Sequence, residues 1–341
     1  MLTGKKILLV APNFYGYQKA VQEDLERAGA VVLYIENRAF RHDEFTKGTY
    51  WFERFVCRKN RYINTTLVPV THEKFDICLF VNLFSFRPEL IQNLKKQNPD
   101  IKCFLYLWDN VKTYSWEQFF VYFDKVYTFD QLDARDLRIN YLPNFYLDPG
   151  DASTSEKVLD VSFVGSFQVH RFEALNKVAE RSRHQSKTFF FYLYLHPNYN
   201  RLKFNIYVYR VVSIFPFLFK GYKFLFGLIS GKITSEFVHH RPLSFREIVQ
   251  SILNSKCVLD IPFPTQTGCT QRLIQALALN RKVITTNAGA VHESFYDPAY
   301  IKVVPRDCVE IDWDWVNRKN ENKLDITSLR IDNWLSQILT I

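Results

Sequence analysis

The segment Cys257–Asn287 constrains the fold more tightly than any other part of the chain. It reads CVLDIPFPTQTGCTQRLIQALALNRKVITTN. The apolar run Cys257–Ile261 predicts a strand buried on both faces, and the prolines after it end the strand because proline cannot donate to a β-ladder. Apolar residues then recur at helical spacing after Thr270, and Val283–Thr286 predicts a second strand. Strand, helix and strand in this order predict one unit of a parallel α/β sheet.

The loop inside this segment has the features of an anion site. Thr267 and Thr270 are alternative N-caps of the helix, and Gly268 between them leaves the backbone open. Free backbone N–H groups and the positive end of the helix dipole would point to the same place. Arg272, in the first helical turn, would add a bidentate phosphate contact. The alternative is an ordinary strand–helix–strand unit, which needs a cap but no ligand.

The same residues resemble a known family. The pattern S-K-x-V-L-D-I-P, then Q-x-G-x-T-x-R-x-I-x-A-L, then K-V-I-T-T-N is similar to the donor half of bacterial GT-B-type glycosyltransferases, chiefly those of lipopolysaccharide and capsule clusters and the CgeB-like proteins. The resemblance implies a nucleotide-sugar donor, no further cofactor and no metal, with Arg272 stabilising the leaving diphosphate. Many such enzymes hold the donor ribose with a helix glutamate, where this chain has Gln275. The implied donor contacts in this segment are Gln266, Gly268, Cys269, Thr270, Gln275 and Asn287.

A second stretch of the same kind begins at Leu159. The run Leu159–Val164 predicts a strand that Gly165 and Ser166 end, followed by a helix from about Arg171. The letters V-S-F-V-G-S with a downstream arginine resemble the opening of the GT-B C-terminal domain. There the glycine lets the donor phosphate approach the backbone, Ser166 lies beside it, and Arg171 pairs with the phosphate. The alternative for Arg171 is a solvated helix charge, which is the commoner place for an arginine.

The N-terminal part of the chain also predicts a parallel sheet. Strands are expected at Lys6–Val10 and Val31–Ile35, with a helix between them. The loop after the first strand contains only Gly16, whereas a nicotinamide dinucleotide site would need GxGxxG, so the sequence argues against a dehydrogenase. The GT-B resemblance implies that this loop faces the interdomain cleft, with Asn13, Tyr15 and Gly16 against the acceptor or donor. The alternative is an ordinary turn between strand and helix.

A candidate catalytic carboxylate follows the strand predicted at Lys102–Leu107. Asp109 stands just past the carboxyl end of that strand, where parallel sheets bind ligands. Beside the aromatic Trp108, the pKa of Asp109 would rise toward the range of a general base. The resemblance agrees, since related sequences carry Y-x-W-D followed by F-D, and it implies that Trp108 lies on the acceptor side. The alternative for Asp109 is an N-cap of the helix that would follow it. Asp130 is expected to cap a different helix, Gln131–Arg138.

The stretch Tyr141–Gly150 is rich in Pro, Asn, Asp and Gly and predicts a domain boundary. The predicted fold class is α/β, with two doubly wound Rossmann-like domains facing a cleft, the GT-B arrangement. The resemblance implies that residues 1–146 are the acceptor-side domain and residues 147–312 the nucleotide-sugar-binding domain, which would contain an insert at 199–231. Residues 313–341 form a tail whose helix crosses back to the first domain. The nearby Asp312-Trp313-Asp314 is interpreted as surface acid and not as a metal-binding motif.

One segment carries the whole net charge of +9. Between Arg181 and Ser235 there are nine Lys or Arg and no Asp or Glu, and the rest of the chain has 35 basic and 35 acidic residues. The aromatic insert at 199–231 has uncharged runs too short to span a bilayer. Apolar surface with only positive charge predicts binding to an anionic membrane surface. The alternative is that the insert is a buried helical hairpin with snorkelling lysines. Because the sequence shows no broad basic face, we expect no nucleic-acid partner.

The resemblance to GT-B-type enzymes implies that the chain is a glycosyltransferase. It would move a sugar from a nucleotide-sugar donor to a lipid-linked or lipopolysaccharide glycan, or to another surface glycan. No signal peptide is visible and the six cysteines show no paired spacing, so a cytoplasmic protein, peripheral on the inner face of the cytoplasmic membrane, is expected. One alternative is a non-catalytic GT-B-like nucleotide-sugar-binding scaffold, which loss of the helix glutamate would permit. Another is a GT-B-fold epimerase, which would need more carboxylates and histidines than the predicted cleft supplies.

Overall fold

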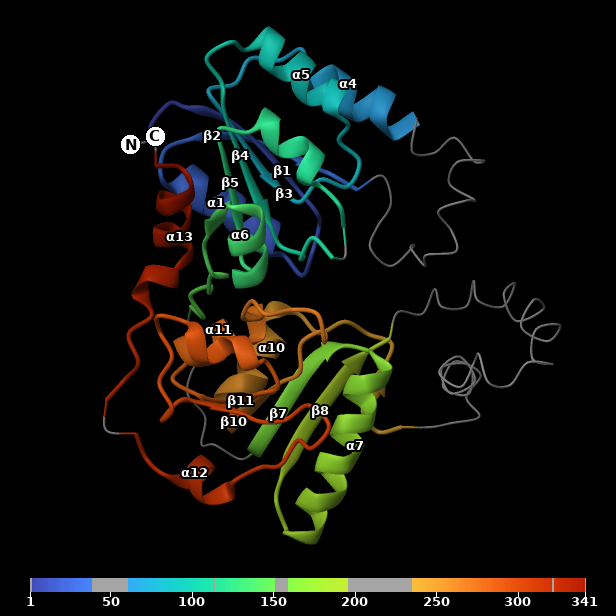
Figure 1. Cartoon of the computed structure of the whole chain (residues 1–341), viewed down its shortest axis with the longest axis vertical. Helices are drawn as coiled ribbons and strands as arrows, with labels where there is room; N and C mark the ends of the chain where they lie inside the picture. The colour runs from blue at the N-terminus through green and yellow to red at the C-terminus, as the bar shows by residue number, and fades with distance from the viewer. Residues whose placement is uncertain are drawn as a thin grey trace, which may run out of the picture.

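The computed structural model describes residues 2–38, 61–112, 114–150, 159–195, 235–320 and 322–340. The first half of the chain lies above the second half in Figure 1, and the end of the chain returns to the first half. The insert at 199–231, predicted to bind membranes, lies outside the described residues. Within them, no helix has both the length and the apolar character needed to cross a membrane.

The first sheet has six parallel strands in the order β2-β1-β3-β4-β5-β6. Its central strands are buried on both faces, as continuous apolar runs predict. The α1 side of the sheet also receives the last helix of the chain, and α5 covers the other side. The strands are β1 (Lys6–Ala11), β2 (Val31–Glu36), β3 (Ile77–Val81), β4 (Lys102–Leu107), β5 (Lys125–Thr128) and β6 (Asn140–Tyr141). The helices within the described residues are α1 (Tyr17–Arg27), η2 (Ile63–Leu67), α4 (Val68–Val70), α5 (Pro88–Gln97), η3 (Glu117–Tyr122) and α6 (Gln131–Leu137).

The second sheet also has six parallel strands, in the order β12-β11-β10-β7-β8-β9. Helices α7 and α12 pack on one face, and α10 and α11 on the other. The strands are β7 (Leu159–Ser166), β8 (Phe189–Tyr194), β9 (Val238–His239), β10 (Ser255–Asp260), β11 (Lys282–Thr285) and β12 (Ile301–Val303). The helices are α7 (Val169–His184), α10 (Phe245–Leu253), α11 (Gln271–Ala278), η6 (Ala288–His292) and α12 (Trp313–Asn317). Two such sheets confirm the predicted α/β class with two Rossmann-like domains.

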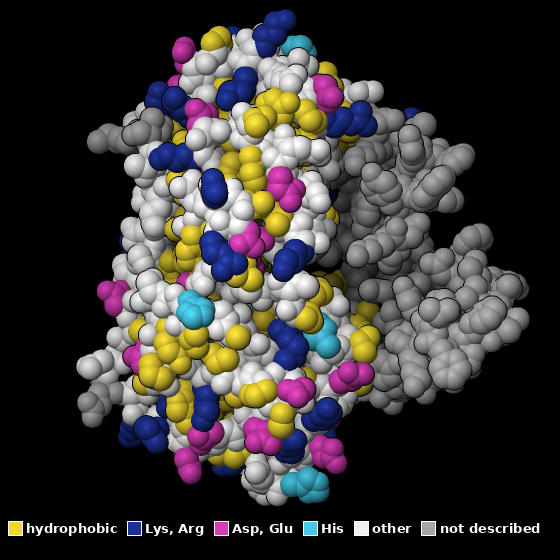
Figure 2. Space-filling model, viewed as in Figure 1, with side chains coloured by type: hydrophobic (Ala, Val, Ile, Leu, Met, Phe, Trp, Pro, Cys, Tyr) yellow, Lys and Arg dark blue, Asp and Glu magenta, His cyan; other side chains and the backbone are white. Residues whose placement is uncertain are grey.

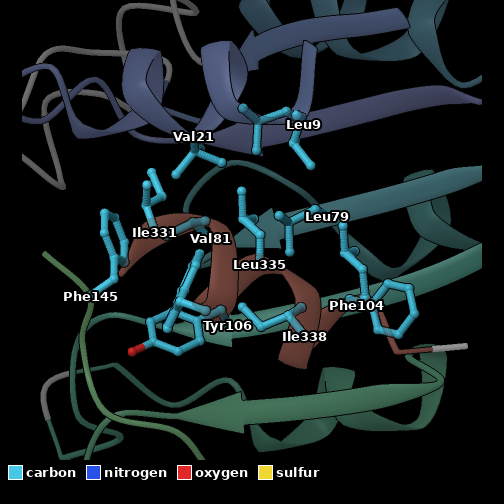
Figure 3. Packing of buried hydrophobic residues seen from close by; sticks show 14 of the residues in the cluster. Leu9, Val21, Leu79, Val81, Phe104, Tyr106, Phe145, Ile331, Leu335 and Ile338 are labelled. Carbon is cyan, nitrogen blue, oxygen red and sulfur yellow. The ribbon is translucent and has the colours of Figure 1, made fainter. Parts of the chain in front are cut away.

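The final helix completes the core of the first sheet. After the short turn η7 (Thr327–Leu329), α13 (Ile331–Ile338) lies against that sheet. Trp334 is fully buried, with its ring 4.7 Å from that of Tyr106 and 4.5 Å from that of Phe145. Figure 3 shows Leu335 and Ile338 of this helix among the side chains of the first sheet. The first sheet therefore depends on residues from the far end of the sequence for one of its covered faces.

The strand predicted at Leu159–Val164 is two residues longer, because Gly165 and Ser166 belong to β7 and pair with β8, and the strand ends at Ser166. A Cβ atom on Gly165 would lie 2.5 Å from Nη2 of Arg272. The glycine therefore leaves space for that arginine side chain while the strand continues past it. Strand β7 consequently reaches the edge of the sheet that faces the first domain, where Ser166 meets Tyr15 at 3.5 Å.

Candidate active site

The topological switch points of the two sheets face each other. In the first sheet the order in which strands are added reverses between β1 and β3, and in the second sheet it reverses between β7 and β10. Doubly wound sheets bind ligands at the carboxyl ends of the strands at these points. Tyr15 follows β1 and Ser166 ends β7, and their hydroxyl oxygens are 3.5 Å apart. The candidate site is therefore the junction where these two strand ends meet.

Arg171 and Arg272 lie on the second-domain side of this junction. Arg171 is 7% exposed and donates from Nε to the carbonyl of Ile261 and from Nη1 to that of Ser166. The alternative interpretation of Arg171 as a solvated helix charge is therefore wrong. Arg272 donates from Nε to the carbonyl of Val164 and forms a 2.9 Å ion pair with Asp260. Both guanidinium groups thus lie at the switch point of the second sheet.

Arg306 and His170 join this cluster, and the sequence analysis missed both. Arg306 donates from Nη1 to the carbonyl of Pro262 at 2.7 Å. Burial and the charges of Arg171 and Arg306 lower the pKa of His170 to about 4, so its ring is neutral at pH 7. Arg306 could have been noticed as a basic residue just beyond a strand, but β12 is three residues long and had not been predicted. We call Arg171, Arg272 and Arg306 the arginine cluster.

The arginine cluster carries more positive than negative charge. Burial, together with the charge of Arg272, lowers the pKa of Arg171 to about 9, with Arg306 adding to this effect. The negative charge of the Asp260 carboxylate opposes this lowering of the pKa of Arg171. Asp260 is fully buried and also accepts hydrogen bonds from the hydroxyls of Thr270 and Thr285. Among the described residues, Asp260 is the carboxylate whose charge acts on all three guanidinium groups, so positive charge exceeds negative charge within this cluster.

The loop predicted to hold phosphate is part of the domain junction. The N–H groups of Thr267 and Gly268 both donate to the carboxylate of Asp130 in the first domain. Thr270 is the residue that caps α11, accepting from the N–H of Leu273. The lack of a side chain at Gly268 lets the first domain approach, because a Cβ there would lie 2.3 Å from the carbonyl oxygen of Phe129.

The other predicted donor contacts of this segment are also engaged inside the protein. Gln275 is 1% exposed, and its amide both accepts from and donates to the backbone of Leu147. Gln266 donates to the carbonyl of Gly268, and Asn287 donates to the carbonyls of Thr267 and Gly268. Cys269 is buried, and its carbonyl accepts from the side chain of Asn144. The structure thus brings these residues together at the junction, next to the arginine cluster.

Asp109 lies at the carboxyl end of β4 on the first-domain side. Its Oδ2 accepts a 2.8 Å hydrogen bond from Asn82, whose own Oδ1 accepts from the N–H of Trp108 at 2.7 Å. Burial raises the pKa of the Asp109 carboxyl, while the charge of Arg38 and the Asn82 hydrogen bond oppose this rise. The alternative interpretation as an N-cap is wrong, because the next described helical turn begins only at Glu117. Asp130, by contrast, caps α6 as predicted.

Two polar residues near Asp109 were not singled out from the sequence. Asn82 is buried and has a φ of 60°, and Arg38 lies 4.0 Å above the ring of Phe84. Burial lowers the pKa of Arg38, and the charge of Asp109 is the leading opposing influence. Among the described residues, Nη1 of Arg38 is buried without a hydrogen-bond partner. Both residues closely follow a strand, so the rule that identified Asp109 would also have found them.

The predicted acceptor residues gather at the carboxyl ends of β1 and β4. Trp108 donates from its indole to Asn144 and packs edge-on against Phe14 and Tyr17. The N–H of Asn13 donates to Glu36 at the end of β2. Gly16 has a φ of 82°, a left-handed conformation that favours glycine, and starts α1. The result is an aromatic surface beside Tyr15 and Ser166.

In the part of the chain that the structure describes, no group of three or more His, Cys, Asp or Glu side chains could hold a metal ion. Asp312, the first acid of Asp312-Trp313-Asp314, caps α12 and pairs with Lys302 at 2.5 Å. Its carboxylate therefore has a structural role at the surface of the second domain.

No family model and no curated protein sequence matches the chain. Solved structures do match it along almost its whole length. The N-terminal domain of Candida albicans trehalose-6-phosphate phosphatase aligns at TM-score 0.54 and 11% identity, covering 100% of this chain and 97% of that one. An α,α-trehalose-phosphate synthase (UDP-forming) from Burkholderia vietnamiensis aligns at TM-score 0.52 and 10% identity, covering 98% and 92%. The chain has the GT-B fold. The lipopolysaccharide outer core galactosyltransferase WaaB also aligns, at TM-score 0.47 and 10% identity over 98% and 95% of the two chains.

Proposed function

We propose that this GT-B protein is a glycosyltransferase that moves a sugar from a nucleotide-diphosphate donor to a saccharide acceptor. The observation that carries the proposal is the arginine cluster at the switch point of the second sheet. Arg272 forms an ion pair with the buried carboxylate of Asp260 there, and the charge of this carboxylate also acts on Arg171 and Arg306. Burying charge without compensation costs several kcal/mol, so a site of this kind is suited to a ligand that brings negative charge. A diphosphate fits this requirement.

Two further features support a diphosphate at this place. Helix α7 is 16 residues long and begins beside Ser166, and its N-cap residue Gln168 makes no side-chain capping hydrogen bond. The positive end of its dipole is therefore directed at the same junction as Arg171. The synthase with the same fold is described as UDP-forming. The fold is thus compatible with a nucleoside diphosphate as leaving group, and the arginines would stabilise the charge that develops on it.

Asp109 is the residue we assign as general base. It lies on the opposite side of the junction from the arginine cluster, at the carboxyl end of β4, and Asn82 fixes its orientation. Its raised pKa brings it closer to the range in which a base can accept a proton from an acceptor hydroxyl. Trp108 and Tyr15 would provide an aromatic surface against which a sugar ring could lie. Asn13 and Gly16 complete the proposed acceptor side.

For the acceptor we propose a lipid-linked or lipopolysaccharide glycan, reached at an anionic membrane surface. The support comes from the charge distribution in the sequence, because the acid-free segment from Arg181 to Ser235 holds the entire charge surplus. On the face shown in Figure 2, the described basic and acidic side chains are interspersed. Mixed charge on that face is consistent with a surplus concentrated in one segment. The protein would then act at the inner face of the cytoplasmic membrane.

Arg306→Gln tests the diphosphate site. Glutamine removes the positive charge together with the hydrogen bond from Nη1 to the carbonyl of Pro262, and leaves an uncharged polar side chain in its place. A charge-assisted contact contributes about 1.5–3 kcal/mol, so we expect the dissociation constant of the preferred nucleoside diphosphate to rise about 10- to 100-fold. Isothermal titration with UDP, GDP, CDP and ADP measures this dissociation constant.

Arg181→Gln, near the far end of α7, is the matched control and should leave binding unchanged. Equal affinity of folded Arg306→Gln and wild type would remove Arg306 from the site, and no binding to the wild type would contradict the proposal.

Asp109→Asn tests the base. The amide can still face Asn82, so donor binding and folding should persist, while turnover should fall about a hundredfold or more because general-base help is of that size. The wild-type rate should also fall as pH decreases through the raised pKa of Asp109, since protonation removes the base. That acid limb should lie above the ordinary aspartate pKa of about 3.9. Initial rates against pH with a saturating donor measure both effects. Undiminished turnover in the variant would exclude Asp109 as the base.

Vesicle sedimentation tests the membrane proposal. Each basic residue near an anionic surface contributes about 1 kcal/mol, so changing Arg210, Lys220 and Lys223 to Glu should release the protein from anionic vesicles. Binding of the wild type should decrease with salt, because ions screen the attraction. Nucleotide binding should be unaffected by the three changes.

The matched control changes the exposed residues Lys19, Lys96 and Lys323 to Glu, which alters the net charge by the same amount. This variant should still sediment with anionic vesicles. Equal sedimentation of the wild type with neutral and anionic vesicles, or none with either, would contradict the proposal that the acid-free segment binds an anionic membrane surface.

A further inference from the structure

The carboxylate of Asp130 fills the place where the loop of the second domain would receive an anion. Its Oδ2 accepts from the N–H groups of Thr267 at 2.8 Å and Gly268 at 3.1 Å. Its Oδ1 accepts from the hydroxyl of Thr267 at 2.5 Å. Asp130 itself belongs to the first domain, directly after β5, and is 1% exposed. Two consecutive N–H groups converging on one oxygen form the type of nest that binds phosphates.

The same carboxylate also caps its own helix. Oδ1 accepts from the N–H groups of Leu132 at 3.1 Å and Asp133 at 3.3 Å, at the start of α6. Five donors therefore reach Asp130, two from the first domain and three from the second. A carboxylate has about four lone-pair positions, so this one is saturated. A phosphate could reach the nest only by displacing Asp130, whose like charge would repel it.

Other first-domain groups hold the same loop from both sides. The side chain of Asn110 donates to the carbonyl of Thr265 at 3.1 Å, and that of Asn144 donates to the carbonyl of Cys269 at 3.0 Å. The carbonyl of Phe129 lies so close to Gly268 that any side chain there would clash with it. The segment 265–269 is thus built to fit against the first domain along its whole length.

We propose that Asp130 is the resident anion of the Thr267–Gly268 nest, and that it fastens the two domains together at this point. The nest takes a carboxylate of the chain itself, and free phosphate is excluded from it. The junction is consequently held closed before any substrate arrives. One consequence rests on the proposed function: the donor diphosphate binds at the arginine cluster and leaves the nest undisturbed.

Asp130→Ser separates the two tasks of the carboxylate. Serine is as good an N-cap as aspartate, so α6 should keep its first turn, but its shorter side chain cannot reach the second domain. Hydrogen exchange of peptides covering 265–270 measures the fastening. We expect exchange there to become about 10- to 100-fold faster, the factor expected for losing a charge-assisted hydrogen bond. Peptides of α6 should exchange as in the wild type.

Asp136→Ser is the matched control, because Asp136 lies on the same helix and pairs only with its neighbour Arg135 among the described residues. It should leave the exchange of 265–270 unchanged. Unchanged exchange in Asp130→Ser would overturn the proposal. If Asp130→Ser does not fold, Thr267→Val provides a second test. It removes the hydroxyl that donates to Asp130 and accepts from the N–H of Leu132, and it should also accelerate exchange in 265–270. Failure to do so would equally overturn the proposal.

Inorganic phosphate provides a second readout. Phosphate should slow exchange of 265–270 in Asp130→Ser, where the nest is vacant, and should not change it in the wild type. Protection of 265–270 by phosphate in the wild type would show that the nest is open and would contradict the proposal. These outcomes do not depend on nucleotide binding. A wild type that binds no nucleoside diphosphate but passes both exchange tests would contradict the proposed function and leave the fastening role of Asp130 established.

Discussion

The buried ion pair between Asp260 and Arg272 organises the edge of the second domain that faces the first. Asp260 ends β10, and its two oxygens accept from Arg272, from the capping residue Thr270 and from Thr285 of β11. Arg272 in turn donates to the carbonyl of Val164 in β7 and lies 4.2 Å above the ring of Phe163. One carboxylate thus fixes the start of α11 against three adjacent strands. Removing either partner of a buried pair costs about 3–5 kcal/mol, because the other charge is left uncompensated.

Because Arg272 is held by these structural bonds, it differs from the other two members of the arginine cluster. The structural bonds of Arg272 consume its Nε and Nη1, whereas Arg171 and Arg306 bind only backbone carbonyls through their described hydrogen bonds. Carbonyls satisfy hydrogen bonds but supply no negative charge. The unbalanced charge of the cluster therefore resides mainly on Arg171 and Arg306, and a bound diphosphate would complete the compensation that Asp260 begins. The same geometry places this charge across the junction from Asp109.

Much of the architecture could be predicted because local patterns determine it. Buried parallel strands are continuous apolar runs, so β4 was predicted at its observed bounds, Lys102–Leu107. The caps at Asp130 and Thr270 are short-range hydrogen bonds whose residue types are visible in the sequence. Asp109 was found because the carboxyl ends of parallel strands are where ligands bind, and burial raises its pKa in the expected direction.

The partners of the site could not be predicted, because they are distant in sequence. Asp130 and Thr267 are 137 residues apart, and nothing local to either shows that they meet. Gly268 and Gly165 both looked like positions for a phosphate, but the atoms nearest to a Cβ added there belong to Phe129 and Arg272. Arg306 was missed because its strand is short. At both glycines the sequence pattern correctly indicated that other atoms approach the backbone closely. Only the tertiary structure showed which atoms these are.

A crystal structure of the protein with its preferred nucleoside diphosphate tests this account most directly. We expect a phosphate oxygen within hydrogen-bonding distance, about 2.7–3.2 Å, of the guanidinium of Arg171 or Arg306. We also expect that the carboxylate of Asp130 remains bound to the N–H groups of Thr267 and Gly268. A diphosphate seated on those two N–H groups, with Asp130 displaced, would contradict this account.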